Sequence, residues 1–336
     1  MPTEGPSAAL REAVAGRALS PEPDDYLEDA VQELALAARG TLDGVIFFGS
    51  RRTGAAKANQ WSAYDLFVVV HRYRPFYRAM RDAGLSGKRP GFMALISCWL
   101  PPTQYSIRFK ESPVHMKTAV IQTDAFLRET GPKRRDHFCI GRLFQPSRIV
   151  YARDRPTREA ILAGLVSAHT ESWAWTRPWL PPAFDAAAYG QNALAVSMSW
   201  EVRPEPPGRA EALWEAQREE QTPVFKALLI DLAARGELAP AVDGGPGTWS
   251  PTREVDPAET LRLKLYFRRS IARSTTRWLK HVLSFEGWLE YILRKANRHG
   301  DEPIELSEKE RRWPLIFLWP RVFRHLRDRK RKESPS

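Results

Sequence analysis

Residues suited to phosphate chemistry are concentrated between Gly44 and Val70. An apolar run ends at Gly49-Ser50, a polar loop follows, and a second apolar run begins after Asp65. We therefore predict a strand, a Gly-Ser turn, a loop and a second strand that carries a carboxylate near its start. Glycine lets the backbone approach a triphosphate, and the serine hydroxyl and the N–H groups of the turn can hydrogen-bond it. A strand-borne carboxylate can hold the Mg²⁺ that bridges the phosphates, so Asp65 is the predicted metal ligand.

The same stretch is also compatible with an ordinary β-hairpin or βαβ turn that carries an exposed aspartate. Strand side chains alternate between faces, so Asp65 shares its face with Ala63 and not with Tyr64, and this site offers one carboxylate. A Walker P-loop is excluded. Gly49 and Gly54 have the G-x-x-x-x-G spacing, but alanines follow where Lys and Ser or Thr are required.

The composition predicts a globular protein with anionic partners. A hydrophobic fraction of 43% distinguishes the chain from disordered proteins, and its 336 residues suffice for two domains. The net charge of +11 and the pI near 9.8 favour nucleotides, nucleic acid or acidic lipid. Cys98 and Cys139 form no disulfide framework or metal motif, and we expect both to be reduced thiols in the core. The N-terminus lacks a secretory apolar region, and no apolar run is long enough to span a membrane, which favours a cytoplasmic protein.

Hydrophobic periodicity predicts an α+β fold, with a mixed sheet and helices in the first half and mostly helices in the second. In the first half we expect a helix over 24–39 that ends at Gly40 and a short helix over 75–83. Further strands are expected there at 92–100, 105–109 and 116–123. The helices expected in the second half span 157–176, 185–200, 209–235 and 258–298.

The C-terminal segment joins an apolar aromatic run to a basic cluster. Residues 307–310 have the pattern of a capping box, residues 313–320 are apolar almost throughout, and seven Lys or Arg residues follow. We predict an amphipathic basic helix over 307–332 that lies at a water–lipid interface. The predicted membrane contacts are Trp313, Ile316, Phe317, Trp319, Arg321 and Arg324. A terminal helix that docks on the core, or a tail that binds nucleic acid, would also explain this segment.

Three blocks of the sequence occur in the order and spacing of one protein family. The first, FFGSRRTGAAKANQWSAYDLFVVV, has the Gly-Ser turn, a lysine in the loop and one aspartate before a strand. The second is HMKTAVIQTDAFLRE followed by HFCIGRLFQPSRIVY, and the third is FRRSIARSTTRWLKHVLSFEGWLEYILRK. Together they resemble the mitochondrial-type phosphatidate cytidylyltransferases. These are peripheral CDP-diacylglycerol synthases of the DNA polymerase β-like nucleotidyltransferase superfamily.

The resemblance includes the single carboxylate. Members of the superfamily usually have Asp-x-Asp where this chain has Ala63-Tyr64-Asp65, whereas the family, like this chain, has one aspartate. The chain departs from the family in having Gly-Ser-Arg-Arg in place of Gly-Ser-Gly, and in its longer and more aromatic basic C-terminus.

The resemblance implies that CTP reacts with phosphatidic acid to give CDP-diacylglycerol and pyrophosphate, with Mg²⁺ as the cofactor. It implies that Asp65 ligates Mg²⁺, that Lys57 neutralises charge on the leaving pyrophosphate, and that Lys117 faces the α-phosphate or the lipid phosphate. The nucleotide-binding residues that it implies are Gly49, Ser50, Arg142, Arg273, Ser274 and Thr275. A third carboxylate is usual in the superfamily, and Glu111 and Asp124 are candidates, although Asp124 also fits a helix N-cap.

The element pattern and the resemblance together predict a division of the chain. We expect a flexible N-terminus over 1–23, a nucleotidyltransferase domain over 24–155, a helical domain over 156–300 with a mobile loop at 239–257, and an interfacial tail over 307–332. The expected location is the inner face of a membrane, where the partners are CTP, phosphatidic acid and the anionic lipid surface. Nucleic acid is not an expected partner, and the oligomeric state is left open.

Two other interpretations use the same residues. A nucleotidyltransferase that acts on another lipid, a soluble acceptor or RNA would share Gly49, Ser50 and Asp65. A non-catalytic homologue would have lost turnover together with the second carboxylate. Turnover that is independent of lipid would indicate the first, and the absence of Mg²⁺-dependent nucleotide binding would indicate the second.

Overall fold

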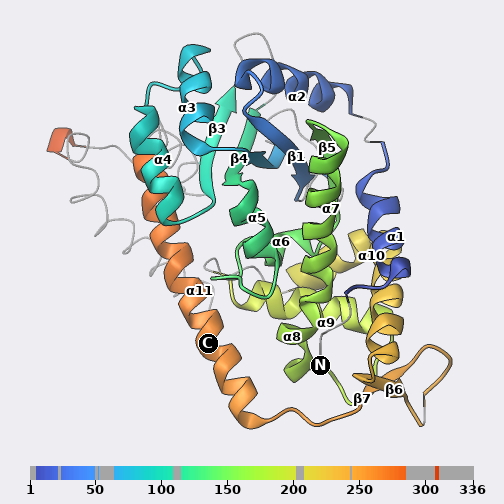
Figure 1. The fold of residues 1–336 in the computed structure, drawn as a ribbon. Coiled ribbons are helices and arrows are strands. Elements are labelled where there is room, and N and C mark those ends of the chain that lie inside the picture. The colour runs from blue at the N-terminus through green and yellow to red at the C-terminus, as the bar shows by residue number, and fades with distance from the viewer. Residues whose placement is uncertain are drawn as a thin grey trace. The chain divides into compact units, whose positions relative to one another are not determined.

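The structure is a computed structural model that describes residues 5–21, 24–49, 52, 64–108, 115–201, 208–242, 244–284 and 307–309. The chain divides into two compact units, Met1–Ser284 and Phe285–Ser336. Residues 307–309 are the described part of the second unit, and the fold below is that of the first. This first unit has an α+β fold with a mixed sheet, as the sequence predicts, and the sheet has five strands (Figure 1).

The sheet has the strand order β3-β4-β2-β1-β5. Its strands are β1 (Leu42–Phe48), β2 (Tyr64–Val70), β3 (Thr103–Arg108), β4 (His115–Gln122) and β5 (Ser147–Ala152). β2 and β4 are parallel, and the other neighbouring strands are antiparallel. The strands predicted on either side of the Gly-Ser turn, and those at 105–109 and 116–123, are thereby confirmed. Phe48 pairs with Asp65, and Asp65 pairs with Lys117, so β1 ends where β2 and β4 begin.

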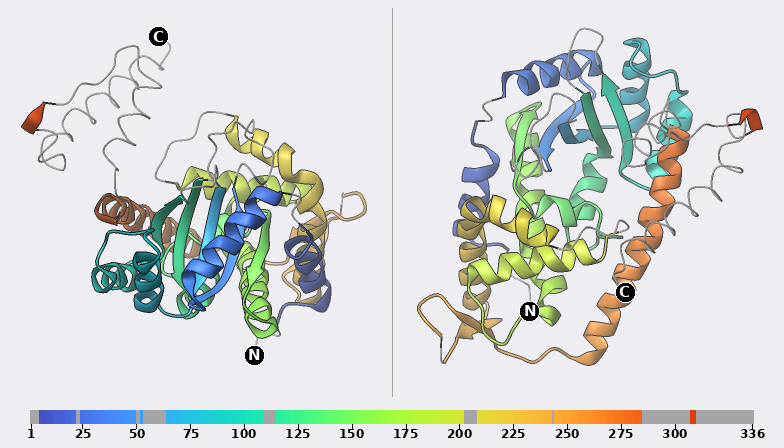
Figure 2. Two further views of the ribbon diagram at one scale, coloured as in Figure 1. Left: turned by 90° about the horizontal axis from the view of Figure 1, so that it is seen from above. Right: turned by 180° about the vertical axis from the view of Figure 1, so that it is seen from behind.

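Helices cover both faces of this sheet (Figures 1 and 2). One face packs against α2 (Asp25–Ala38), α3 (Tyr73–Asp82) and α4 (Pro90–Trp99). The other face packs against α1 (Ala8–Ala18), α5 (Thr123–Thr130), α6 (Ile140–Leu143) and α7 (Arg155–Thr170). The second layer is extended by α8 (Ser172–Thr176), a 3₁₀ turn at Arg177–Trp179, α9 (Ala186–Ser199), α10 (Arg209–Ala234) and α11 (Pro257–Ser284). Among the described helices, none has both the length and the apolar character needed to cross a bilayer.

Burial on both faces explains why the strands are apolar almost throughout. In β1, Val45 and Phe47 belong to the core under α2, α3 and α4, whereas Ile46 belongs to the core on the opposite face. Strand side chains alternate, so Asp65 of β2 projects to the same face as Phe67, which lies in the core with Ile46. The carboxylate therefore faces the layer that contains α6 and α7.

The N-terminal residues differ from the flexible segment predicted over 1–23. Ser7 caps α1, because its hydroxyl accepts a hydrogen bond from the Leu10 N–H at 3.2 Å. Leu10 and Val14 are fully buried, and α1 contacts α7 and α10. The periodic signal of this short, alanine-rich helix is weak, so the sequence pattern did not reveal it.

The segment predicted as a strand over 92–100 is the helix α4. Pro90 lies in its first turn, where the missing N–H group has no helical partner to lose. Met93 and Ser97 are buried and lie four residues apart, which is a helical spacing. An uninterrupted apolar run does not distinguish a helix from a buried strand, so the sequence pattern alone was misleading.

The thiols of the two cysteines lie in different surroundings. Cys139 is buried, and burial raises the pKa of its thiol well above the usual value. Cys98 is exposed on α4, so the expectation that both cysteines are core thiols is wrong for this residue.

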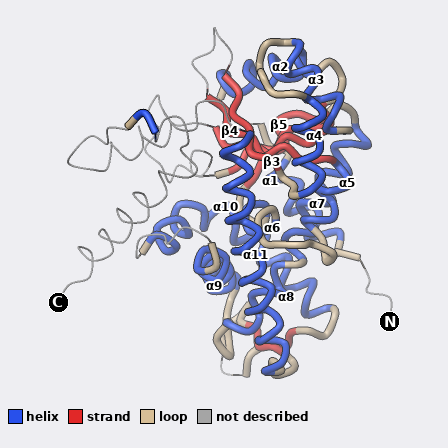
Figure 3. Tube along the Cα trace, turned by 90° about the vertical axis from the view of Figure 1, so that its left-hand side faces the viewer, coloured by secondary structure: helices blue, strands red, loops and turns tan. Residues whose placement is uncertain are grey.

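The linker predicted as a mobile loop over 239–257 contains a hairpin of β6 (Leu238–Pro240) and β7 (Trp249–Pro251). Trp249 and Phe184 also exchange two backbone hydrogen bonds, at 2.8 and 3.0 Å. In Figures 1 and 3 this hairpin lies near α8 and α9, toward the end of the unit opposite the five-stranded sheet. The Pro- and Gly-rich composition indicated turns correctly but did not reveal this pairing.

Candidate active site

Gly49 lies immediately after β1 in a left-handed conformation, with a φ of +90°. A side chain at this position would place its Cβ atom 2.9 Å from the Oδ2 atom of Asp65. Both the backbone conformation and the available space therefore require glycine. The structure thus sets the glycine of the predicted Gly-Ser turn directly against the carboxylate that the sequence singles out.

Lys117 lies beside Asp65 because β2 and β4 pair in register at these two residues. Neighbouring strands are about 4.8 Å apart, and paired residues project to the same face of a sheet. Lys117 is exposed and Asp65 is half-buried. A carboxylate that can ligate a cation and an ammonium that can neutralise a phosphate are therefore adjacent, as the predicted chemistry requires.

Arg52 is the second arginine of the Gly-Ser-Arg-Arg segment, which differs from the Gly-Ser-Gly of the family. It forms an ion pair with a glutamate of α10. Its Nη1 donates to Oε2 of Glu220 at 2.8 Å, and its Nη2 donates to Oε1 of the same carboxylate. The arginine side chain is almost fully buried in this bidentate pair. This pair therefore ties Arg52, three residues after Gly49, to the helical layer. The sequence gives no sign of this role, since Glu220 lies 168 positions away.

A second buried arginine, Arg17 of α1, interacts electrostatically with this pair. Its Nη1 donates to Gln221, and its Nη2 lies 3.2 Å from Nε2 of His169. Burial lowers the pKa of Arg17 to about 10, an effect that Glu220 opposes and Arg52 reinforces. Burial also lowers the pKa of His169 to about 3, so this imidazole is neutral at physiological pH. More cationic than anionic charge is therefore placed in this part of the molecule, which favours an anionic ligand nearby.

Arg142 lies on α6, on the side of the sheet that Asp65 faces. Its guanidinium stacks on the ring of Phe138 at 4.0 Å, and this ring lies 6.4 Å from that of Phe67 on β2. Phe67 is two residues from Asp65 and shares its face. The Nη2 atom of Arg142 is 3.4 Å from Oε1 of Glu201, and the arginine side chain keeps partial exposure. Arg142 can therefore meet a ligand without leaving its place on Phe138.

Gly141 allows the Gly-Arg-Leu segment at 141–143 to pack closely against its neighbours. A Cβ atom at this position would lie 2.7 Å from Cδ2 of His137 and 2.8 Å from Oγ of Ser197. The absence of a side chain lets α6 pack closely on α9, which carries Ser197. The position of Arg142, the next residue, follows from this packing.

A buried carboxylate, Asp136, accepts hydrogen bonds from two arginines of α11. Arg273 Nε and Arg277 Nη2 each donate to Oδ2 of Asp136 at 2.8 Å. Arg277 also donates to the carbonyl of Pro101 at 2.8 Å and stacks on Phe138 at 4.5 Å. Burial acts to raise the pKa of Asp136, but Arg277 and Arg273 outweigh it and hold this pKa below its usual value. We call Asp136, Arg273 and Arg277 the Asp136 cluster.

Three predicted nucleotide-binding residues lie in or beside this cluster. Arg273 is engaged by Asp136, and the hydroxyl of Thr275 donates to the Ile271 carbonyl of its own helix at 3.0 Å. Ser274 Oγ accepts a long hydrogen bond of 3.4 Å from Arg277. A nucleotide would have to compete with these contacts, so their role in nucleotide binding stays a prediction.

Sequence reasoning missed Asp136 and Arg277. The available signal was the spacing of Arg273 and Arg277, which places both arginines on one face of a helix. Nothing in the sequence pairs that face with Asp136, which lies 141 positions before Arg277.

Lys280 of α11 lies near the Asp136 cluster and donates hydrogen bonds at the C-terminal end of α4. Its Nζ donates to the carbonyl of Leu100, and to the carbonyl of Pro102 and the hydroxyl of Thr103 at 3.0 Å each. A cation at the C-terminus of a helix is favourable. Burial, reinforced by the charge of Arg277, nevertheless lowers the pKa of Lys280 to about 7.

The groups near Asp65 fit a cation that arrives with a nucleotide. Within the described ranges, no group of three or more His, Cys, Asp or Glu side chains could hold a metal ion. Mg²⁺ commonly binds through one or two carboxylates together with substrate phosphates. One carboxylate therefore suits a metal–triphosphate complex better than a preformed metal centre. Asp124, a candidate third carboxylate, lies in the first turn of α5, and Gln122 occupies the N-cap position predicted for it.

Several predicted residues lie outside the described part of the chain. From the active site these are Ser50 and Lys57, together with the candidate carboxylate Glu111. From the predicted membrane contacts they are Trp313, Ile316, Phe317, Trp319, Arg321 and Arg324. Their roles stay predictions.

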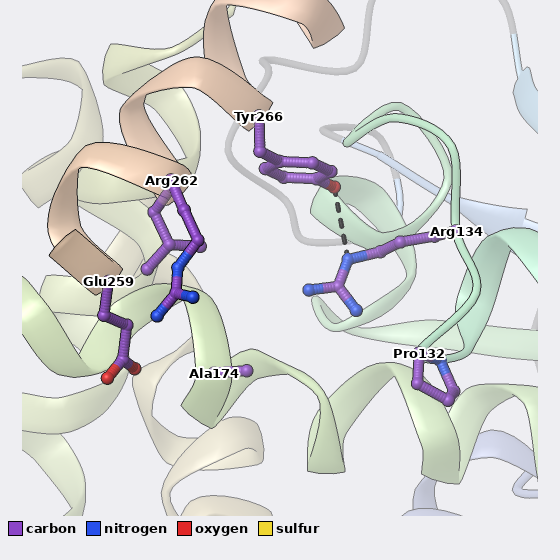
Figure 4. A pocket seen from close by; sticks show the side chains of 7 residues that line it. Pro132, Arg134, Ala174, Glu259, Arg262 and Tyr266 are labelled. Atoms are coloured by element: carbon purple, nitrogen blue, oxygen red, sulfur yellow. Dashed lines mark hydrogen bonds between the residues drawn. The ribbon is translucent and has the colours of Figure 1, made fainter.

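A surface pocket lies between the start of α11 and the segment around Arg134 (Figure 4). Arg134 donates to Glu171 at 2.6 Å and to the hydroxyl of Tyr266 at 3.2 Å. Glu259, on the opposite wall, accepts a hydrogen bond of 2.7 Å from Arg177. Because Arg134 and Glu259 are already paired within the chain, we assign no ligand to the pocket. Its lining residues are Pro132, Arg134, Ala174, Glu259, Arg262, Leu263 and Tyr266.

The chain matches no protein-family model and no curated protein. The resemblance to phosphatidate cytidylyltransferases therefore rests on the three sequence blocks alone.

Proposed function

We propose that the chain is a nucleotidyltransferase whose active site is formed around Gly49, Asp65 and Lys117. The observation that carries this proposal is the position of left-handed Gly49, where a Cβ atom would lie 2.9 Å from the Asp65 carboxylate, with Lys117 paired beside Asp65. These groups offer a close backbone approach, a metal-ligating carboxylate and an exposed cation at one end of a mixed sheet. Nucleotidyl transfer needs such groups, because positioning and charge neutralisation dominate its catalysis.

In the proposed reaction, a phosphate oxygen of the acceptor attacks the α-phosphorus of the nucleotide in line. The bond from the α-phosphorus to its bridging oxygen breaks, and pyrophosphate leaves with that electron pair. Mg²⁺, when bound, would supply charge neutralisation on the triphosphate. Asp65 would hold the ion–triphosphate complex in place, and the backbone at Gly49 would allow its close approach. Lys117 and Arg142 would neutralise the acceptor phosphate and the α-phosphate.

We further propose CTP as the nucleotide and phosphatidic acid as the acceptor. The support is the resemblance of the three blocks, which come from distant parts of the sequence. The first block covers the end of β1 and all of β2, the second covers β4, α5, α6 and β5, and the third begins in α11. β1 pairs with β2 and β5, β2 pairs with β4, and α11 contacts β3, so all three blocks border one sheet. The net charge of +11 also suits a phosphorylated lipid substrate.

The same proposal includes the domain division and the location. Residues 24–155 would form the nucleotidyltransferase domain, 156–300 the helical domain, and 307–332 an amphipathic basic helix. The protein would act as a peripheral protein on the inner face of a membrane, where its lipid substrate resides.

Pyrophosphate release tests this proposal. The protein is incubated with Mg²⁺ and each of ATP, CTP, GTP and UTP, with and without phosphatidic acid vesicles. We expect release that requires CTP, Mg²⁺ and the lipid together, and that stops when EDTA removes the metal. Release without lipid, or with another nucleotide preferred, would indicate a nucleotidyltransferase with a different substrate. No release under any condition would indicate a non-catalytic homologue.

A further inference from the structure

The helix α4 exposes an apolar face that a surface helix normally buries. Phe92, Leu95 and Trp99 are 42%, 69% and 63% exposed, and we call these three residues the α4 face. The segment from Pro90 to Pro102 contains no charged residue. A helix that is apolar nearly all round usually lies in a core or against lipid. Here it lies at the surface of the unit, next to α3 (Figure 1).

Hydrogen bonds on the opposite side hold α4 in place. Ser97 Oγ lies 2.6 Å from Oγ1 of Thr103 and 3.0 Å from the hydroxyl of Tyr77, which lies on α3. Lys280 donates to the carbonyls of Leu100 and Pro102 beyond the end of the helix. The helix is therefore fixed by polar contacts from within the unit. In the described part of the chain its apolar face is exposed and can meet a partner.

Basic residues precede α4 in the sequence, and several lie on the neighbouring helix α3. Between residues 71 and 102 the sequence has one acidic residue, Asp82, and six basic ones: Arg72, Arg74, Arg78, Arg81, Lys88 and Arg89. The four arginines from 72 to 81 are exposed on α3 or just before it, and α3 packs beside α4 (Figures 1 and 2). Within the described part of the chain, none of the six basic side chains takes part in an ion pair. Their charge is therefore available to an anionic partner.

We propose that the α4 face and the arginines of α3 dock on the surface of an anionic bilayer. Trp99, Leu95 and Phe92 would enter the interface, where tryptophan and aliphatic side chains are favoured. The arginines would contact lipid phosphates, and each basic residue near an anionic leaflet adds to the attraction. An excess of basic over acidic residues on the helix beside an apolar face complements such a leaflet. This docking goes beyond the proposed function, because it requires neither a nucleotide nor turnover, and it is distinct from the contacts predicted in residues 313–324.

A fluorophore on Cys98 tests the proposal directly. Cys98 is exposed on α4, whereas the thiol of Cys139 is buried with a raised pKa, so the full-length protein is labelled at Cys98. The polarity-sensitive label is followed without nucleotide, with vesicles of phosphatidylcholine alone or mixed with phosphatidylglycerol. Phosphatidylglycerol supplies negative charge without being the proposed substrate. We expect a blue shift with the anionic vesicles and none with the neutral ones.

Two results would overturn the proposal. One is binding to anionic vesicles without a change in the Cys98 label, which would locate the membrane contact elsewhere. The other is a label already shielded before vesicles are added. Shielding that depends on protein concentration would indicate that a second copy covers the α4 face, and shielding that does not would indicate coverage by residues 285–336.

Paired substitutions in the full chain separate the apolar and charged contributions. Leu95→Gln with Trp99→Gln should weaken partitioning onto anionic vesicles by about tenfold or more, whereas Leu36→Gln, an exposed leucine on α2, should not. Arg74→Gln with Arg78→Gln should also weaken it by about tenfold or more, whereas Arg155→Gln with Arg158→Gln on α7 should have a much smaller effect. All altered residues are exposed, and circular dichroism checks the fold. Equal binding by both test pairs and their controls would contradict the proposal.

Discussion

The residues around Gly49 and the Asp136 cluster both place a carboxylate near basic side chains, but they differ in how the charges are used. At Gly49, the exposed Lys117 stands beside the half-buried Asp65 on the next strand. In the Asp136 cluster, two arginines already donate to a single buried carboxylate oxygen at 2.8 Å. The exposed ammonium of Lys117 suits a ligand, whereas the buried carboxylate of Asp136, which two arginines neutralise, suits a structural clamp.

The Asp136 cluster, together with Lys280, connects two parts of the fold. Arg277 joins Asp136 to the Pro101 carbonyl, and Lys280 binds the carbonyls that follow α4. Together they attach α11 to the segment that leads into β3. Breaking a buried ion pair leaves an uncompensated charge, so this cluster should matter for stability more than for chemistry.

The largest expected effect concerns Asp65. Asp65→Asn removes the metal-ligating charge but keeps the size of the side chain, so turnover should fall about 10³-fold or more. The unfolding midpoint should change little. Asp29→Asn, an exposed carboxylate on α2, is the matched control and should keep full turnover. A folded Asp65→Asn variant with normal pyrophosphate release would remove the site assignment.

The Asp136 cluster should show the opposite behaviour. Asp136→Asn should lower the free energy of unfolding by about 3 kcal/mol or more, measured in urea. Asp136→Asn combined with Arg277→Met should cost less than the sum of the two single changes, because the charges are lost together. Glu159→Gln, which breaks an exposed pair with Arg11, should cost less than about 1 kcal/mol. Similar losses of unfolding free energy for the buried and the exposed pair would contradict a structural role for the Asp136 cluster.

Gly49 and Gly84 both have a left-handed backbone, but only at Gly49 would a side chain meet Asp65. Both have positive φ, +90° and +72°, but a Cβ atom at Gly84 would meet nothing within 4 Å. Gly84→Ala should therefore cost about 1 to 2 kcal/mol, the price of the left-handed backbone. Gly49→Ala should cost more in stability and should also reduce turnover, since it displaces the carboxylate. Equal effects at both positions would show that the contact with Asp65 is unimportant.

The smallest effect is a pH dependence from Lys280. Its pKa is about 7 in the folded protein and 10.5 when unperturbed, so unfolding takes up a proton between these values. Stability should therefore rise with pH through this window, and the burial cost should be fully present below about pH 7. From about pH 7.5 to 8.5, the wild type should gain roughly 1 kcal/mol relative to Lys280→Met. A parallel pH profile for the two proteins would contradict this assignment.

The sequence predicted the secondary structure best where the local hydrophobic pattern decides it. Two apolar runs separated by a Gly-Ser turn predicted β1 and β2, and the structure adds the register that pairs Asp65 with Lys117. The pattern failed for α4, because an apolar run does not reveal which side of a helix is buried. It also failed for α1, whose burial depends on contacts with distant helices.

The partners of charged residues were the hardest to predict. Arg52 with Glu220 and Arg277 with Asp136 are pairs separated by 168 and 141 positions. No local spacing links such residues, and only the packing of the helical layer brings them together. The predicted nucleotide contacts on α11 came from the family resemblance, and the structure adds the internal contacts with which a nucleotide would compete.

Transfer of a radioactive label tests the central claim most directly. The protein is incubated with Mg²⁺, phosphatidic acid vesicles and CTP labelled at either the α- or the γ-phosphate, and the lipid is then extracted. Cytidylyl transfer predicts that the α label enters the lipid and that the γ label stays in aqueous pyrophosphate. The γ label in the lipid would indicate a kinase, and both labels in the aqueous phase would show that this chain does not transfer a nucleotide to phosphatidic acid.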